Sequence, residues 1–506
     1  MHCNGHPLFG KPTTEPIFMF TILAQAAAQE PIPVTNLIAL LVFGIAFLLV
    51  LILRFKLQAF LALIVVSILV SVGATFINPE KAAGLTEIGQ TIVTSMGGAL
   101  GFIATIIGIG AIFGAMLEHS GGTQALANTL VRRFGQERAP WAMLLTGFII
   151  SVPVFLDVAL VILAPLLYAL ARDTKKSVLI FGLPLVAGMA VTHAFVPPTP
   201  GPVAVAYFLE VNLGYVIGFG VLVGLPTAII CGPVLCSKLA TLVEVKTPPQ
   251  LTDEENKDEL KLPSFGMIAT LIVLPIALIL AGTIVEQSAI SDLDAGLSKS
   301  ERGAQVAEIL NSMPMMNQVI HFLGHPVIAL MISTLLAIWF LGINRGTSKD
   351  DLVEISTKAL GPAGIIILIT GAGGVFKGVL IATGIADALK EVFSNSGIPI
   401  IVLAYIFATL VRIAQGSATV AMLTAAGLMV SFVEGMSQPF LALIACAIAA
   451  GATGFSHVND SGFWMISRYL GMTEKQTLKT WTVISTSISF VSFSIILILS
   501  LFIPMK

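Results

Sequence analysis

The chain has 506 residues, of which 56% are hydrophobic and only 11% are charged. Soluble domains carry about 25% charged residues, so this composition excludes a soluble globular protein and indicates a polytopic membrane protein. The net charge is -2, and no basic cluster with interleaved aromatic residues occurs, which excludes nucleic acid as a partner.

The first 34 residues precede the first long apolar segment. Met1–Pro16 is polar, and Ile17–Ala28 resembles a weak signal segment without a basic front, so residues 1–34 are assigned as a leader. The cysteines have neither metal-ligand spacing nor a CxxC pair, which predicts packing or lipid-facing roles and no metal or cofactor. They are Cys3, Cys231, Cys236 and Cys446.

Ten apolar segments are long enough to cross a bilayer, for which about 20 residues are needed. They lie at 35–53, 57–77, 95–117, 178–209, 213–236, 265–285, 326–343, 361–382, 438–467 and 480–503. Trp141–Ala171 and Ile398–Phe432 are longer and carry polar or helix-breaking residues at their midpoints. Each is either one long tilted helix or a hairpin that enters and leaves the membrane on the same side.

The positions of the basic residues favour the hairpins. With two hairpins, most of the 26 lysines and arginines lie in cytoplasmic connections, whereas two crossings would move Arg172 and the basic loop 238–261 outside. The chain then has ten crossings, two re-entrant hairpins that open to opposite sides, and both termini outside.

Two of the crossing segments contain breaks. Four prolines between Pro197 and Pro202 interrupt 178–209, because proline lacks the backbone N–H that a helix needs. Gly451–Gly462, which contains no proline, interrupts 438–467. Backbone without internal hydrogen bonds survives at membrane depth only where protein or a water-filled cavity covers it, so both breaks point to a binding site.

The two halves of the chain also match in sequence. Gly108–Leu117 echoes Gly371–Leu380, and hairpins and breaks recur at nearly the same offset. Because the copies begin on opposite sides, the pattern predicts two inverted repeats, an all-α architecture of secondary transporters. The predicted division is a leader at 1–34, repeats at 35–247 and 265–506, a cytoplasmic linker at 248–264 and an outer loop at 286–325.

Polar groups inside the membrane are costly and therefore mark the candidate site. Asp157, at the first hairpin tip, can carry protons, bind substrate hydroxyls or form a structural ion pair. Arg412, near the second tip, offers a planar fork to a substrate carboxylate; the alternatives are a salt bridge with Asp157 or snorkelling. The other candidates at the second tip and second break have helix capping and interhelical hydrogen bonding as alternatives. They are Gln415, Ser417, Thr419, Asn459, Asp460 and Ser461.

His193 and His457 flank the breaks, and together with Asp157 they are the candidates for proton coupling. Packing against apolar helices is the alternative for both histidines. Lys377 lies in a Gly-rich helix and is expected to pair with a carboxylate or to snorkel. Gly110/Gly114 and Gly374/Gly378 have the spacing of close helix packing.

A secondary symporter explains these features better than a membrane enzyme or a channel does. The sequence contains no GxxxxGK[ST], GxSxG or HExxH motif and no repeated filter-like loop. A sodium-coupled carboxylate transporter remains an alternative to a proton symporter.

Three motifs resemble the gluconate permease (GntP) family of proton symporters, over roughly residues 35–506. They are His193–Pro198 with Pro200–Pro202, Gly454–Trp464, and Thr480–Thr482. The resemblance implies uptake of gluconate or related sugar acids across a bacterial inner membrane, by elevator-type movement within an ion-transporter superfamily. Thr199, a further substrate-binding candidate, stands where the gluconate transporters carry histidine, which leaves the choice among sugar acids and small hydroxy acids open. The expected partners are this carboxylate, protons, lipid and a second copy in a homodimer.

Overall fold

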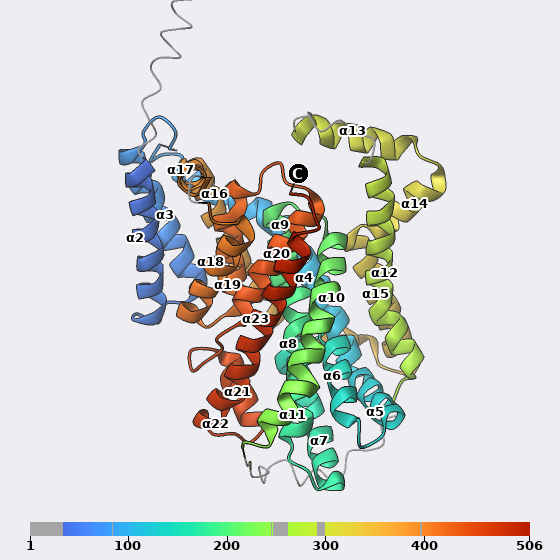
Figure 1. The fold of residues 1–506 in the computed structure, drawn as a ribbon. Helices are drawn as coiled ribbons and strands as arrows, with labels where there is room; N and C mark the ends of the chain where they lie inside the picture. The colour runs from blue at the N-terminus through green and yellow to red at the C-terminus, as the bar shows by residue number, and fades with distance from the viewer. Residues whose placement is uncertain are drawn as a thin grey trace, which may run out of the picture.

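The structure is a computed structural model that describes residues 34–82, 84–243, 245, 262–290, 299–394 and 397–505. Within these ranges every regular element is a helix (Figure 1). Nine helical stretches among them have the length and composition of membrane spans. They are Val34–Ile52, Ala59–Ile77, Ile88–His119, Leu179–Leu209, Leu213–Ala240, Phe265–Ala289, Pro326–Arg345, Lys349–Ala382 and Glu474–Ser500. The prediction of an all-helical polytopic membrane protein is confirmed.

The first half of the chain contains ten of the described α-helices. They are α2 (Val34–Leu53), α3 (Ala59–Ile77), α4 (Ile88–His119), α5 (Gly122–Phe134), α6 (Ala139–Ile150), α7 (Leu156–Thr174), α8 (Leu179–Phe195), α9 (Pro200–Leu209), α10 (Leu213–Ile229) and α11 (Leu235–Ala240). Local chemistry sets several of their ends. Asn212, for example, begins α10 because its side chain accepts a hydrogen bond from the Gly214 N–H.

The second half contains the remaining described α-helices. They are α12 (Phe265–Ile290), α13 (Lys299–Ser312), α14 (Met315–Gly324), α15 (Pro326–Ala337), α16 (Lys349–Ala382), α17 (Ile385–Ser394), α18 (Ile400–Gln415), α19 (Ala418–Met429), α20 (Gln438–Thr453), α21 (Ser461–Tyr469), α22 (Glu474–Lys479) and α23 (Trp481–Ser500). The expected outer loop at 286–325 therefore contains the end of α12 and all of α13 and α14. Residues 1–33 of the expected leader and residues 248–261 of the expected linker lie outside the described residues.

Both predicted breaks are present. The first lies between α8 and α9: Val196 is extended, and α9 restarts with Pro200 in its first turn, where a missing N–H costs nothing. The second lies between α20 and α21, where Asp460 caps the restarted helix by accepting from the Gly462 N–H. The segment at 438–467 is thus two short helices around a non-helical stretch.

The two long apolar segments are each divided near the middle. Residues 151–155 separate α6 from α7, and Gly416 and Ser417 separate α18 from α19. The helices α6, α18 and α19 are apolar but shorter than a membrane span. The fourth helix, α7, has 19 residues, and the hairpin arrangement stays a prediction.

Small residues allow helices of the two halves to pack closely. A Cβ built on Gly374 would lie 2.5 Å from the Ala99 Cβ, and one built on Gly378 would lie 2.0 Å from the Ser95 Oγ. The helices α4 and α16 therefore approach at the second predicted glycine pair. In the first pair, Gly114 faces the first hairpin instead, with its Cβ position 2.4 Å from the Pro153 oxygen.

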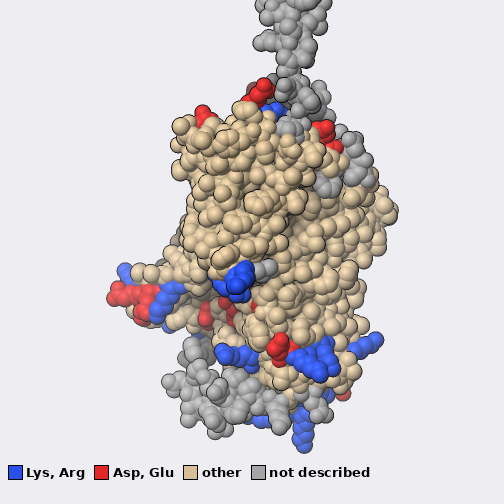
Figure 2. Space-filling view, turned by 90° about the vertical axis from the view of Figure 1, so that its left-hand side faces the viewer, with Lys and Arg blue, Asp and Glu red and all other residues tan. Residues whose placement is uncertain are grey.

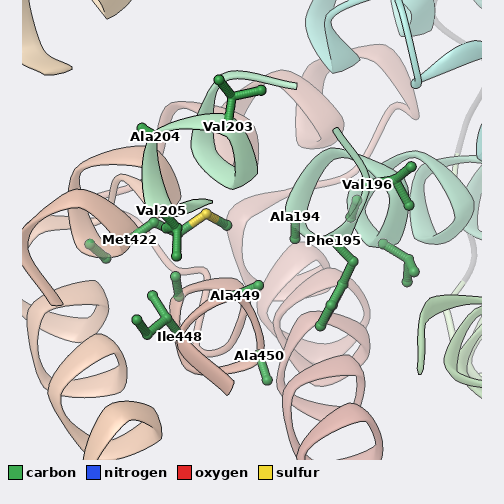
Figure 3. Close-up of a cluster of buried hydrophobic side chains, with 14 of the residues drawn as sticks. Ala194, Phe195, Val196, Val203, Ala204, Val205, Met422, Ile448, Ala449 and Ala450 are labelled. Atoms are coloured by element: carbon green, nitrogen blue, oxygen red, sulfur yellow. The ribbon is translucent and has the colours of Figure 1, made fainter. Parts of the chain in front are cut away.

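One apolar core joins the broken segments (Figure 3). Side chains on both sides of the first break, including Phe195 and Val203, gather with Met422 of α19 and Ile448 of α20. Lys and Arg gather near one end of the molecule, leaving most of the visible surface uncharged (Figure 2). That end carries α5, α7, α11 and α22 in Figure 1 and is the expected cytoplasmic side.

Candidate functional site

The second hairpin tip and the second break form the polar centre of the candidate site. Gly416 ends α18 with φ +82°, and a Cβ there would lie 2.3 Å from the Asn459 backbone oxygen, so this approach requires glycine. The Asn459 Nδ2 donates to the Ile413 oxygen at 2.9 Å, and the His457 Nε2 lies 3.2 Å from the same oxygen. Break residues thus satisfy carbonyls that the end of α18 leaves without helical donors.

Arg412 and Asp460 form a buried ion pair within this centre. The Arg412 Nη2 and the Asp460 Oδ2 are 2.5 Å apart, and only 4% and 12% of the two side chains are exposed. Arg412 also donates from Nε to the Gly454 oxygen at 3.2 Å and from Nη1 to the Gly416 oxygen. The alternative that Arg412 pairs with Asp157 is wrong, because the guanidinium reaches the second break, whereas Asp157 is exposed in the first turn of α7.

Helix α23 holds the second break in place through Ser456. The Trp481 Nε1 donates to the Ser456 Oγ at 2.7 Å, and the Thr482 Oγ1 donates to the Ser456 oxygen at 2.6 Å. Ser456 in turn donates from Oγ to the Asp460 Oδ2 at 2.5 Å. Sequence reasoning gave no role to Ser456 or Trp481. The feature of the sequence that could have indicated this contact is the pair of hydrogen-bond donors Trp481 and Thr482 at the start of an apolar helix.

Two amide side chains at the centre have unused hydrogen-bonding atoms. Both Oε1 and Nε2 of Gln415, and the Oδ1 of Asn459, are buried without a hydrogen-bond partner among the described residues. An unpaired buried polar group costs about 1–3 kcal/mol, so such groups call for a functional explanation. Gln415 lies three residues after Arg412 on α18, and Asn459 directly precedes Asp460 in the second break.

The remaining candidates of the second half are helix-end residues. Ser417 caps α19 by accepting from the Val420 N–H at 3.4 Å, and Asp460 caps α21, so the capping roles considered from the sequence are present. Thr419 is half-buried in the first turn of α19, and Ser461 is exposed as the first residue of α21.

The candidates of the first half form a separate group. The His193 Nδ1 is buried without a hydrogen-bond partner in the described part of the chain, and the Thr199 Oγ1 donates to the Val196 oxygen at 2.7 Å. A cavity of about 20 Å³ between the first hairpin and the first break is lined by both residues. Asp157 interacts electrostatically with His193 and with Glu118, which sequence reasoning missed. No hydrogen bond or ion pair between described residues joins this group to Arg412 and Asp460.

Lys377, on α16, lies apart from both groups, and its side chain reaches the end of α9. Its Nζ donates to the Phe208 oxygen at 2.9 Å and lies 4.0 Å from the Glu210 Oε1. The expected pairing with a carboxylate is therefore present, at the edge of the ion-pair range. Across the described ranges, no group of three or more His, Cys, Asp or Glu side chains is placed to hold a metal ion.

Comparison with known proteins places this arrangement in a family. The model described as GntP family permease matches residues 36–502. The inner membrane permease YgbN of Escherichia coli (strain K12) is 37% identical over 470 residues, which cover 91% of this chain and 97% of that protein. The low-affinity gluconate transporter of the same strain is 36% identical over 445 residues, covering 88% and 93%. The chain belongs to the GntP permease family.

The resemblance drawn from the motifs is thereby confirmed, and a solved structure supports the fold. MtrF of Neisseria gonorrhoeae, described with a class of antimetabolite efflux pumps, matches 93% of this chain and 95% of its own with a TM-score of 0.59. At 13% identity this likeness shows the fold alone. This GntP permease is a multi-pass inner membrane protein.

Proposed function

We propose that this GntP permease imports gluconate or a related sugar acid together with protons. Two relatives with 36% identity over most of the chain, from Escherichia coli and Bacillus subtilis, are named gluconate transporter and gluconate permease. The observation that carries the proposal is the buried Arg412 guanidinium, with the Gln415 amide and the Asn459 Oδ1 unpartnered among the described residues of the same polar centre. This set of groups matches a molecule with one carboxylate and several hydroxyls.

In the proposed complex, the substrate carboxylate binds to Arg412. Charge-assisted bonds from a guanidinium to a carboxylate are among the strongest hydrogen bonds in proteins, and the planar fork fixes their direction. The Gln415 amide then donates to the same carboxylate and accepts from a hydroxyl, because an amide carries both donors and an acceptor, and the Asn459 Oδ1 accepts from another hydroxyl. Ser417, Thr419 and Ser461 line the same helix ends, and Thr199 contributes from the first break.

The Arg412–Asp460 pair also supplies a reason for proton coupling. The pair is already balanced in charge, so an incoming carboxylate adds one uncompensated negative charge to a buried site. Such a charge is expensive away from water, and protonation of a carboxylate removes it. We assign this proton first to Asp460, whose place on the guanidinium the substrate takes, while Asp157, His193 and His457 remain candidates for the path.

Uptake of labelled gluconate into proteoliposomes tests the function. An acidic exterior should drive accumulation without sodium, and Arg412→Lys should weaken binding about ten- to a hundredfold, because lysine keeps the charge but loses the fork. Asp460→Asn should still exchange gluconate across the membrane but should no longer respond to the pH gradient. Sodium-dependent uptake that an uncoupler leaves unchanged would refute proton coupling and favour the sodium alternative.

The proposed transport cycle uses an elevator-like movement in a homodimer. Its carrier part comprises the two broken helices and the segments α6–α7 and α18–α19, acting as re-entrant hairpins of two inverted repeats. The shared apolar core of Figure 3 supports this grouping, because it packs α8 and α9 against α19 and α20. Labelling of Arg138→Cys and Lys175→Cys tests the first hairpin: a re-entrant hairpin exposes both to a membrane-impermeant reagent from the same side.

A further inference from the structure

A row of hydroxyl side chains on α23 faces the second break. The Ser456 N–H donates to the Ser485 Oγ at 3.3 Å, and the Phe455 N–H donates to the Thr486 Oγ1 at 3.3 Å. The Ser456 oxygen accepts from Thr482, so both backbone polar groups of Ser456 are bonded to α23. Ser456 is fully buried. Its position therefore follows α23, a helix without any ionisable side chain.

The backbone directly before Ser456 is strained. Phe455 has φ +54°, in the left-handed region that bulky side chains rarely adopt. Its ring meets Phe490 of α23 edge-on, with centroids 6.0 Å apart. A residue keeps such a conformation only where its surroundings hold it, and strain of this kind is concentrated at functional sites. The contacts with α23 thus hold a strained segment that sets the direction of the Ser456 side chain.

The direction of the Ser456 hydroxyl follows from its two neighbours. The indole of Trp481 can only donate, so the Ser456 Oγ accepts from it. An ionised carboxylate can only accept, so the single hydroxyl hydrogen goes to the Asp460 Oδ2. Trp481 is buried, and its bond keeps the hydroxyl hydrogen directed at the carboxylate.

Both lone pairs of the Asp460 Oδ2 are in use. This oxygen accepts from the Ser456 hydroxyl and from the Arg412 Nη2, while the Oδ1 accepts from the Gly462 N–H at 2.9 Å. A carboxylate oxygen has two lone pairs. A proton can therefore add to the Oδ2 only at the position that Arg412 leaves.

Apart from Arg412, no ionisable side chain of the described residues bonds to Asp460. The His457 Nε2, in the same break, lies 3.2 Å from a backbone oxygen of α18 instead, and the Tyr405 hydroxyl is bonded to α23. Helix α20 contributes only the Cys446 thiol, and helices α19 and α23 carry no ionisable residue. The charge of Asp460 is therefore controlled by Arg412 and by hydrogen bonds.

We propose that Ser456 is a positioning residue for proton coupling, with its hydroxyl oriented by Trp481. The hydroxyl keeps one lone pair of the Asp460 Oδ2 and leaves the other to Arg412 and the coupling proton in turn. When the gluconate carboxylate takes Arg412, one proton from the outer solution adds to the Oδ2. When gluconate leaves, that proton returns to water and Arg412 forms the ion pair again. This role rests on the proposed function. Because a donated hydrogen bond favours the charged carboxylate, Ser456 also delays protonation until the substrate is bound.

The pH dependence of gluconate binding tests this role, with labelled gluconate and the purified full-length protein. In the wild-type chain, affinity should rise as the pH falls, because Asp460 takes up a proton on binding. Ser456→Ala should move this profile about one unit toward higher pH, the equivalent of losing a hydrogen bond to a charged group. Trp481→Phe should move it the same way by roughly a few tenths of a unit, because it removes only the bond that polarises the hydroxyl. Adding Trp481→Phe to Ser456→Ala should move it no further.

Trp464→Phe is the matched control. The Trp464 Nε1 donates to the Val458 oxygen of the same break at 2.8 Å, and its loss should leave the profile in place. A purely structural role of Ser456 would lower the melting temperature or weaken binding equally at every pH.

An unmoved profile in folded Ser456→Ala would overturn the proposal, and if that variant does not fold, an unmoved profile in Trp481→Phe would do so. Failure of the proposed function would appear differently, as absent gluconate uptake or as binding to the wild-type chain that does not depend on pH.

Discussion

Gln415 offers a test in which substrate affinity and stability change differently. Its amide is buried, and neither of its polar atoms has a partner among the described residues. Methionine has nearly the same length and no polar atom to leave unpaired. Gln415→Met should therefore keep or raise the free energy of unfolding of the substrate-free protein, whereas a hydrogen-bonded glutamine would lose stability on this change.

The loss of affinity follows from the number and kind of bonds removed. If the amide donates to the substrate carboxylate, its removal costs about 1.5–3 kcal/mol. Each 1.4 kcal/mol is a factor of ten in affinity, so gluconate binding should weaken about 10- to 150-fold. The two measurements are equilibrium binding of labelled gluconate and thermal unfolding in the same detergent.

Thr424→Val is the matched control for this prediction. The Thr424 hydroxyl is also buried without a partner in the described chain, and it lies on α19 beyond the first turn. Its removal should leave gluconate affinity within about twofold, because surface and core changes away from a ligand rarely alter binding by more than a few tenths of a kcal/mol. Unchanged affinity in Gln415→Met, or a clear loss of stability, would refute the assignment of Gln415 to the site.

Three further predictions concern stability. Arg412→Met should lower the free energy of unfolding by about 3–5 kcal/mol, because it leaves the Asp460 carboxylate buried without its counter-charge. Adding Asp460→Leu should restore much of this loss, because the double variant buries no charge; thermal unfolding checks both. Gly220→Ala should destabilise by about 1–3 kcal/mol, since its Cβ would lie 2.1 Å from a carbonyl oxygen of α8, whereas Gly218→Ala on the same helix meets nothing within 4 Å. Burial, and secondly the neighbouring imidazole of His321, lowers the pKa of His325 below 6.5. Because the unfolded chain then binds more protons than the folded one, acid lowers stability. Between about pH 7.5 and 5.5 the melting temperature should therefore fall more in the wild-type chain than in His325→Gln.

The backbone breaks could be predicted from the sequence because their causes are local. Proline cannot continue a helix, and this fixes the end of α8 and the start of α9 near Pro197–Pro200. Glycine and an Asp cap act in the same local way around Asp460. Intramembrane polarity likewise marked Arg412 and Gln415 before any contact was known, because such groups are too costly to place in lipid without a role.

The pairing of side chains depended on tertiary structure and could not be predicted. The partner considered for Arg412 was Asp157 at the other hairpin, whereas the structure pairs it with Asp460 at the second break. Sequence separation does not choose between two such acidic residues. A cavity of about 450 Å³ that Lys377 lines was missed for another reason. His321 and His325, which also line it, lie in the expected outer loop, and only the folding of that loop into helices places them there.

The Arg412–Asp460 pair has an electrical consequence. If the substrate replaces Asp460 on the guanidinium and Asp460 takes up one proton, the loaded site differs from the empty site by no net charge. One anion then crosses the membrane with one proton, and the membrane potential does no work on the step. Accumulation would be limited to tenfold per unit of pH difference, about 1.4 kcal/mol, because only the chemical gradient of protons drives it.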